Sequence, residues 1–296
     1  MFKLVNLIPI ETHFKIMKHT RFFLAITAAM CIAACAIIFT KSFAYGIDFS
    51  GGVLVEAKTR GPADVEEMRK QLAELAPRIQ ALGNTGDLVS IYLAKGDKDE
   101  GLMLGELNQL KSILGDSVEY RNTQIVGPKV GADLIRDGII AVILSILVIS
   151  LYIGMRFELP FAVGSLLSIA HDVLLALALM SIMRIGFELT TLAALLTLAG
   201  YSINDTVVIY DRIRENLKKH RAMPIAEVID MSINETFSRT VLTGLTTLLA
   251  LVAIYMFGGE VLRGFSAIMI FGVIVGTWSS VFISTSTLLM FKKLKE

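Results

Sequence analysis

Six long apolar stretches divide this chain of 296 residues. They run approximately over residues 22–43, 138–155, 160–183, 189–210, 237–257 and 265–291. Each approaches or exceeds the roughly 20 residues that a helix needs to cross a bilayer core about 30 Å thick. The pattern therefore predicts a polytopic α-helical membrane protein with six transmembrane helices.

The first stretch shares some features with a secretory signal peptide, because basic residues precede it and small residues lie near its end. Its apolar run is longer than the about 7 to 15 residues of a signal core, and Lys41 follows it directly. We therefore expect residues 22–43 to remain as the first transmembrane helix, after an N-terminal segment of residues 1–21.

Lysine and arginine gather in alternate connections between the stretches. They precede the first stretch, follow the second and the fourth, and end the chain. The opposite short loops carry only Arg184 and Arg263. Because basic loops stay on the cytoplasmic side, both termini are predicted to be cytoplasmic and the segment between the first two stretches to lie outside.

That outer segment, residues 44–133, is polar and long enough to fold as a small domain. Its pattern predicts the order β-α-β-α-β, which is consistent with a small α+β ferredoxin-like periplasmic domain. The expected elements are a strand from Val53, a helix over Pro62–Leu75, a strand over Leu88–Leu93, a helix over Leu102–Leu114 and a strand over Ser117–Val126. Residues 134–296 then hold transmembrane helices two to six with short loops.

Composition agrees with the membrane class and narrows the chemistry. Hydrophobic residues make up 54% of the chain, charged residues 19%, and the mean hydropathy is +0.65. A net charge of +1 gives no overall field that would attract nucleic acid. The sequence lacks a phosphate-binding Gly-Lys-Ser/Thr loop, a Gly-x-Ser-x-Gly elbow and a His-Glu-x-x-His helix. We therefore expect no enzyme activity, no cofactor and no metal, and we interpret Cys31 and Cys35 as small hydrophobic residues.

Ionisable residues inside the predicted membrane helices are the main candidates for function, because they are costly there. Asp205 lies in the fourth stretch, with Tyr201 and Ser202 four and three residues before it, where both can share its helix face and hydrogen-bond to it. Asn204 adds a further polar side chain. Arg239 enters the fifth stretch from the same side of the membrane and can reach Asp205 at a similar depth.

Two readings of Asp205 and Arg239 stay open on these grounds. The pair can simply hold the fourth and fifth helices together, as intramembrane polar groups often do. It can also form a proton relay, because a carboxylate whose charge depends on a neighbouring arginine can take up a proton when that arginine moves away.

Other polar residues in the stretches have weaker signals. His171 and Asp172 are adjacent, so they project about 100° apart and would not both line one narrow path by default. They are either packing residues or a second proton site. A threonine stripe in the fifth stretch suits tight helix contact or a hydrated path, and Gly272 with Gly276 favours close packing. The stripe consists of Thr236, Thr240, Thr243 and Thr247.

Several segments together resemble the SecF members of the SecD/SecF protein-export family, within the RND transporter superfamily. The resemblance runs nearly end to end, apart from the middle of the outer domain. Its segments are Gly46–Gly52, Val126–Gly131, Arg156–Glu158, His171–Val173, Gly200–Asn216 and Asn234–Thr240.

The resemblance implies a bacterial inner-membrane protein that pairs with SecD and associates with the SecYEG translocon. With SecD it would use the proton gradient to assist the export of preproteins, and YajC is a further candidate partner. The family's intramembrane aspartate and arginine map onto Asp205 and Arg239, and SecD contributes another aspartate.

The alternative is half of an RND-type proton-coupled exporter of small molecules or lipids. The outer domain of about 90 residues argues against it, because it is too small for the large substrate-binding folds of drug exporters. An intramembrane enzyme built around His171 and Asp172 would lack a nucleophile or a metal set.

Overall fold

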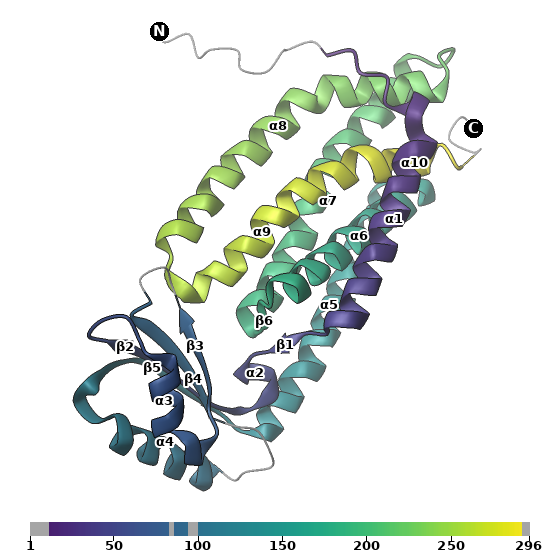
Figure 1. The fold of residues 1–296 in the computed structure, drawn as a ribbon. Coiled ribbons are helices and arrows are strands. Elements are labelled where there is room, and N and C mark those ends of the chain that lie inside the picture. The colour runs from purple at the N-terminus through teal and green to yellow at the C-terminus, as the bar shows by residue number, and fades with distance from the viewer. Residues whose placement is uncertain (1–11, 83–85, 94–99, 292–296) are drawn as a thin grey trace. The chain divides into compact units, whose positions relative to one another are not determined.

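The computed structural model describes residues 12–82, 86–93 and 100–291, and it divides into two compact units. Unit 1 contains the helical bundle, formed by the chain up to Phe43, by Ala141–Ile185 and by the chain from Thr190. Unit 2 contains the sheet domain, formed by Ala44–Ile140 and Gly186–Leu189 (Figure 1).

Within the described residues, six helices are long and apolar enough to cross a membrane, which confirms the predicted number of spans. The long helices are α1 (Thr20–Lys41), α5 (Pro128–Arg156), α6 (Leu159–Met183), α7 (Leu189–Lys219), α8 (Ile225–Phe257) and α9 (Gly259–Ser279). The turn η1 (Met17–His19) precedes α1, and α9 continues through the π-helical segment η4 (Ser280–Ser284) into α10 (Thr285–Leu288).

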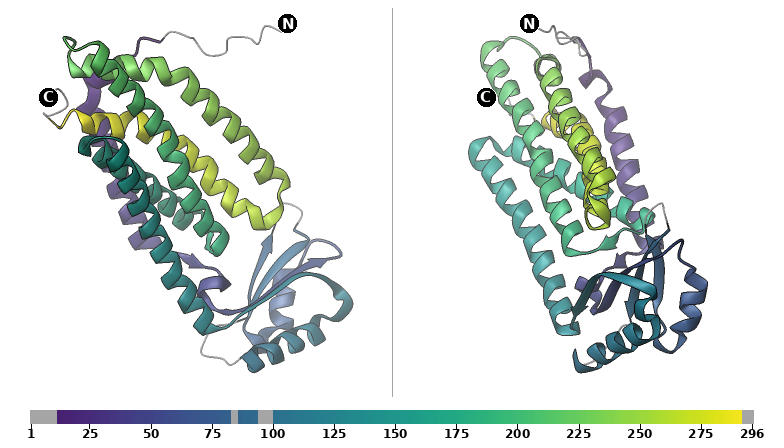
Figure 2. Two further views of the ribbon diagram at one scale, coloured as in Figure 1. Left: turned by 180° about the vertical axis from the view of Figure 1, so that it is seen from behind. Right: turned by 90° about the vertical axis from the view of Figure 1, so that its left-hand side faces the viewer.

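Helix α6 lies at the centre of unit 1. Helices α1 and α9 both pack against α6, and α8 packs along α9 (Figure 2). Gly272 and Gly276 allow α9 to approach α7 closely, since a Cβ atom at Gly272 would lie 2.4 Å from a methyl group of Leu198. The Gly-x-x-x-Gly pair therefore marks close packing, as the sequence predicts.

An aromatic cluster fills the bundle near the end of α7. The rings of Phe161 and Tyr210 meet edge to face with centroids 4.9 Å apart, and Phe157 packs beside both. The Tyr210 hydroxyl group donates a 3.2 Å hydrogen bond to the backbone oxygen of Ser284. Gly164 provides the room for this contact, because a Cβ atom there would lie 2.3 Å from the Tyr210 hydroxyl group.

Unit 2 is built around a four-stranded sheet of order β3-β4-β2-β5, in which all neighbours are antiparallel. The strands are β2 (Gly52–Thr59), β3 (Arg78–Leu82), β4 (Leu88–Leu93) and β5 (Val118–Val126). The helices are α3 (Val65–Gln71) and α4 (Glu100–Leu114), with the 3₁₀ turns η2 (Ala73–Leu75) and η3 (Gly115–Ser117). The order β-α-β-β-α-β is that of a ferredoxin-like domain.

The sequence pattern missed one strand of this sheet and placed one helix start too early. Strand β3 lies at the sheet edge and pairs only with β4 among the described strands. Its inward side chain is Ile79, with polar residues on either side, so it has a weak apolar signal. Helix α3 begins at Val65 rather than at Pro62, because the Asp64 carboxylate caps the amides of Glu66 and Glu67.

The glycine-rich segment before β2 has a structural role within unit 2. Strand β1 (Ala44–Tyr45) pairs in parallel with β6 (Gly186–Phe187), and the short helix α2 (Ile47–Ser50) follows. The Asp48 carboxylate accepts a 2.9 Å hydrogen bond from the amide of Leu189, the first residue of α7. The segment therefore caps the start of the helix that carries Asp205.

Candidate functional site

Asp205 is the buried carboxyl group on which the sequence analysis concentrated. It is only 4% exposed, on the face of α7 that turns into unit 1. Two groups of α8 lie near it, the Arg239 guanidinium group and the Thr243 hydroxyl group, which donates to the backbone oxygens of Arg239 and Thr240. The structure thus places Asp205 and Arg239 near each other from two different helices.

The other polar residues predicted around Asp205 have different partners. The Tyr201 hydroxyl group donates to Thr247 on α8 at 3.3 Å. The Ser202 hydroxyl group donates to Asp172 on α6, so the predicted bond from Ser202 to Asp205 is wrong. Asn204 is exposed on the surface of unit 1, and Arg239 is exposed as well. A charged and a polar side chain therefore remain open beside the buried carboxyl group.

Asp172 is the most highly connected carboxyl group within the bundle and has no exposed surface. Its Oδ2 atom accepts from the hydroxyl groups of Ser202 at 2.5 Å and Ser279 at 2.7 Å. Its Oδ1 atom lies 2.9 Å from Nδ1 of His171. Ser168 donates to Ser279 at 2.8 Å, which extends the cluster along α6.

His171 and Asp172 are closer than their positions on the helix suggested. Their Cα–Cβ bonds diverge, yet their side chains turn toward each other and meet. Helices α1 and α9 both pack against α6 around this pair. The spacing along the helix did not predict this contact, and the expectation that the two residues would not both line one path stays a prediction.

The π-helical segment η4 brings a set of hydroxyl groups against α7. Ser280 forms a 2.8 Å hydrogen bond with Thr206 and donates to the backbone oxygen of Ser202 at 3.2 Å. A π-helical turn interrupts the regular hydrogen-bond ladder and is frequent at functional sites. Sequence reasoning missed these serines, although their density within one apolar stretch was a signal.

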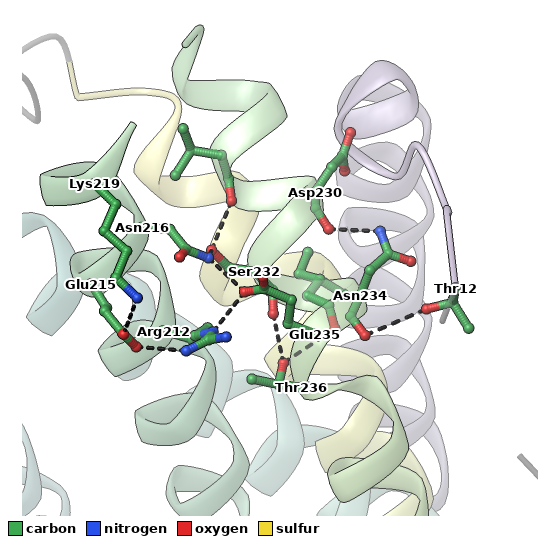
Figure 3. A network of polar contacts seen from close by, with 12 residues as sticks. Thr12, Arg212, Glu215, Asn216, Lys219, Asp230, Ser232, Asn234, Glu235 and Thr236 are labelled. Carbon is green, nitrogen blue, oxygen red and sulfur yellow. Dashed lines mark hydrogen bonds and ion pairs between the residues drawn. The ribbon is translucent and has the colours of Figure 1, made fainter. Parts of the chain in front are cut away.

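A second polar network joins the end of α7 to the start of α8 (Figure 3). Glu235 accepts from Arg212 at 2.6 Å and from Asn216 at 2.7 Å. Asn216 also donates to Ser232 at 3.0 Å, and Glu215 accepts from Arg212 at 2.7 Å. The network links two of the segments that carry the family resemblance, so these polar residues fix the turn between the helices.

The same end of α8 holds the N-terminal segment. The Asn234 side chain accepts from the amide of Phe14 at 2.8 Å and donates to its carbonyl oxygen at 2.9 Å. The Asp230 carboxylate accepts from the amide of Met17 at 2.9 Å. Residues 12–17 are therefore bound to α8 through backbone groups and also through side chains, since the Thr12 hydroxyl group donates to the backbone oxygen of Asn234 and the Phe14 ring contacts that of Phe237.

The polar side chains of the bundle include two buried carboxyl groups. No group of three or more metal-binding side chains comes together among the described residues. What the bundle contains is two buried carboxyl groups on adjacent helices, each with hydroxyl groups around it, and one arginine. Such groups inside a membrane protein suit the binding and release of protons.

Comparison with known proteins identifies the family. Residues 107–294 match the model of the family described as "Protein export membrane protein SecD/SecF, C-terminal". A protein translocase subunit SecF of Rickettsia bellii is 41% identical over 98% of this chain and 97% of its own length. That of Rickettsia akari is 46% identical over 86% of this chain and 83% of its own length.

Two solved structures share the fold. The crystal structure of SecDF from Thermus thermophilus, a translocon-associated membrane protein, matches with a TM-score of 0.87 and 33% identity over 97% of this chain. SecDF in a super-membrane-facing form matches with a TM-score of 0.70 and 35% identity over 95% of this chain. This chain spans only 40% of the first of these solved chains and 39% of the second.

Proposed function

This chain belongs to the SecD/SecF family of protein-export membrane proteins, and on that premise we propose that it is an accessory subunit of the Sec translocation complex. With a SecD partner it uses the proton gradient to assist the export of preproteins across the bacterial inner membrane. The observation that carries the mechanism is the buried Asp205 carboxyl group, with Arg239 and Thr243 near it on the neighbouring helix.

Exposed polar side chains on the apolar helices support the need for a SecD partner. Arg239 and Asn204 are exposed in helices that are otherwise apolar enough to cross a membrane. A charged side chain facing lipid is costly, so a second protein surface with polar groups is expected to cover it. The part of the solved SecDF chains that has no counterpart here is a candidate for that surface. SecYEG, YajC and the translocating preprotein complete the proposed set of partners.

The proposed cycle follows from electrostatics. Removing a carboxylate from water disfavours its charge, whereas a nearby guanidinium group favours it. The proton affinity of Asp205 therefore changes when α8 moves against α7 and changes the distance to Arg239. If that movement also changes which side of the membrane Asp205 can reach, each cycle carries a proton across.

The proposed orientation places both termini in the cytoplasm and unit 2 outside, following the distribution of basic residues in the loops. In a variant without native cysteines, Lys70→Cys in α3 should react with a membrane-impermeant maleimide added outside intact cells. Lys219→Cys at the end of α7 should react only after the membrane is opened. The reverse pattern would contradict the orientation.

The decisive experiment measures preprotein translocation into inverted membrane vesicles that contain ATP, with and without a proton gradient. Asp205→Asn keeps the size of the side chain and removes its ability to release a proton, so gradient-dependent stimulation should be lost at equal complex levels. Asp211→Asn is the matched control, because Asp211 lies on the same helix, is exposed and forms only a 3.4 Å ion pair with Arg156. Full gradient-dependent stimulation in Asp205→Asn would show that Asp205 contributes to packing and does not carry the proton.

A further inference from the structure

Asp172 is a buried carboxyl group surrounded by polar partners. The hydroxyl groups of Ser202 and Ser279 donate to its Oδ2 atom, and Nδ1 of His171 lies 2.9 Å from its Oδ1 atom. Hydrogen bonds of this kind favour the charged form. A charge with no exposed surface is nevertheless strongly unfavourable unless it is paired. The hydroxyl groups satisfy the oxygens but supply no charge.

His171 is the group in contact with Asp172 that can supply this charge. The helices around Asp172 contribute uncharged hydroxyl groups from α7 and α9 and the Cys31 thiol from α1. Among these described groups, only the imidazole ring can become positive. Its Nδ1 atom lies 2.9 Å from the carboxylate, within a charge-assisted hydrogen bond.

The second ring nitrogen of His171 points to a ligand. Nε2 is buried and has no hydrogen-bond partner among the described residues, and the side chain is only 2% exposed. A histidine that serves only packing usually satisfies both ring nitrogens when it is buried. If Nε2 is unprotonated, its lone pair lacks a hydrogen-bond donor, and if it is protonated, its N–H group lacks an acceptor. In both states one small polar partner would satisfy it.

From this geometry we infer that His171 and Asp172 form a second proton-binding site, separate from Asp205. A proton arriving from water binds to the lone pair of Nε2 and converts the ring to imidazolium, while Nδ1–H stays hydrogen-bonded to the carboxylate. The charge of the pair changes from −1 to zero, and release of the proton from Nε2 reverses the step. One proton is gained or lost, and no other bond is made or broken.

Such a site would be connected to α7 through Ser202. The Ser202 hydroxyl group binds Asp172, and Gly276 of α9 packs beside both, because a Cβ atom there would be in van der Waals contact at 3.4 Å from Ser202 and 3.6 Å from Asp172. A change in the charge of the His171–Asp172 pair changes how strongly Asp172 holds this hydroxyl group, three residues before Asp205. The connection to export rests on the proposed function, whereas proton binding rests on the local geometry alone.

The test follows the protonation of His171 directly, in the full chain purified into lipid nanodiscs. The sequence has four histidines, so ¹⁵N-histidine labelling gives few signals, and His171→Gln identifies the one from His171. In the wild type this signal should change between about pH 5 and 8, where imidazole rings titrate. In Asp172→Asn the pH dependence of this signal should differ from that of the wild type, since the carboxyl group that contacts Nδ1 is replaced by an uncharged amide.

Two controls keep the inference separate from the proposed function. Asp205→Asn should leave the His171 titration in place even if it abolishes gradient-dependent export, so the two proposals can fail independently. Ser279→Ala should move the titration without removing it, because one donor to the carboxylate is lost. A His171 signal that stays constant over this pH range, or that responds to sodium at constant pH instead, would overturn the inference.

Discussion

The hydroxyl group of Ser202 on α7 lies 2.5 Å from the Asp172 carboxylate on α6, so the helix that carries Asp205 is tied to a second buried carboxyl group. On its other side the same stretch of α7 faces α8, through Tyr201 and Thr247. Helix α7 therefore carries one of these two buried carboxyl groups and contacts the other through Ser202, so movement of this helix would affect both.

Two substitutions of Arg239 should distinguish the effect of its charge from the effect of its size. Arg239→Met keeps a long apolar stem but removes the positive charge that acts on Asp205, so gradient-dependent translocation should be lost. Arg239→Lys keeps the charge and loses the planar fork, so part of the stimulation should remain. The measurement is translocation into inverted vesicles at equal complex levels, with Arg156→Met as an exposed control. Equal activity of Arg239→Met and wild type would exclude an electrostatic role for Arg239.

Gly164→Ala should destabilise the bundle. Its new methyl group would lie 2.3 Å from the Tyr210 hydroxyl group and 2.8 Å from the backbone oxygen of Ser284. Overpacking of this kind costs about 1 to 3 kcal/mol, which should appear as a lower Tm in detergent. Gly200→Ala is the matched control, because nothing lies within 4 Å of a Cβ atom there.

A double mutant checks whether the contact with Tyr210 causes the loss of stability in Gly164→Ala. Tyr210→Phe removes the hydroxyl oxygen that the new methyl group would meet, so it should recover part of the loss when combined with Gly164→Ala. Tyr210→Phe alone is needed for comparison, because it also loses the hydrogen bond to Ser284. Strictly additive effects of the two substitutions would show that the contact with Tyr210 does not cause the destabilisation.

Glu188, at the boundary between β6 and α7, should make stability depend on pH. Burial, and then the charges of Asp48 and Glu56, raise the pKa of Glu188 above its ordinary value of 4.5. The folded chain therefore binds this proton more tightly than the unfolded chain, and stability falls as pH rises from 4.5 through the folded pKa. Glu188→Gln, which stays neutral, should have a higher Tm than wild type at neutral pH, and the difference should shrink toward acidic pH.

The matched control for Glu188 is Glu119→Gln, an exposed position on β5 whose ion pair with Arg121 is open to solvent. It should change the Tm little at any pH. If the gain from Glu188→Gln were the same at every pH, altered packing rather than the removed charge would explain it.

Asn234 should stabilise the bound conformation of the N-terminal segment, residues 12–17. In Asn234→Ala the amide of Phe14 loses its side-chain acceptor, which is worth about 1 kcal/mol, so its hydrogen exchange should rise about fivefold. The amide of Met17, which is bound to Asp230, should change less. Asp230→Ala should produce the opposite pattern, and residue-resolved exchange of the full chain in detergent measures both. Equal acceleration at both amides in each variant would indicate a segment that opens as one unit.

The sequence by itself determined the six spans, because the length and continuity of an apolar run reflect the thickness of a membrane and need no tertiary information. It also located most of the ferredoxin-like domain, since Leu88–Leu93 and Val118–Val126 have strong strand patterns. Strand β3 was lost because an edge strand has only one neighbour and needs few apolar residues. Asp205 and Arg239 stood out as candidates because charges inside apolar helices are rare.

Only the tertiary structure decided which polar groups meet. Ser202 could face Asp205 by helical spacing, but the approach of α6 places Asp172 within reach of it instead. His171 and Asp172 diverge along the helix, yet helices packed around α6 leave their side chains one shared space. The serines of η4 reach α7 only because a π-helical turn displaces the last helix from a regular path. The sequence pattern of a helix determines on which face of that helix a residue lies. Which residue of another helix it contacts depends on how the two helices cross, and the pattern of one helix holds no information about that.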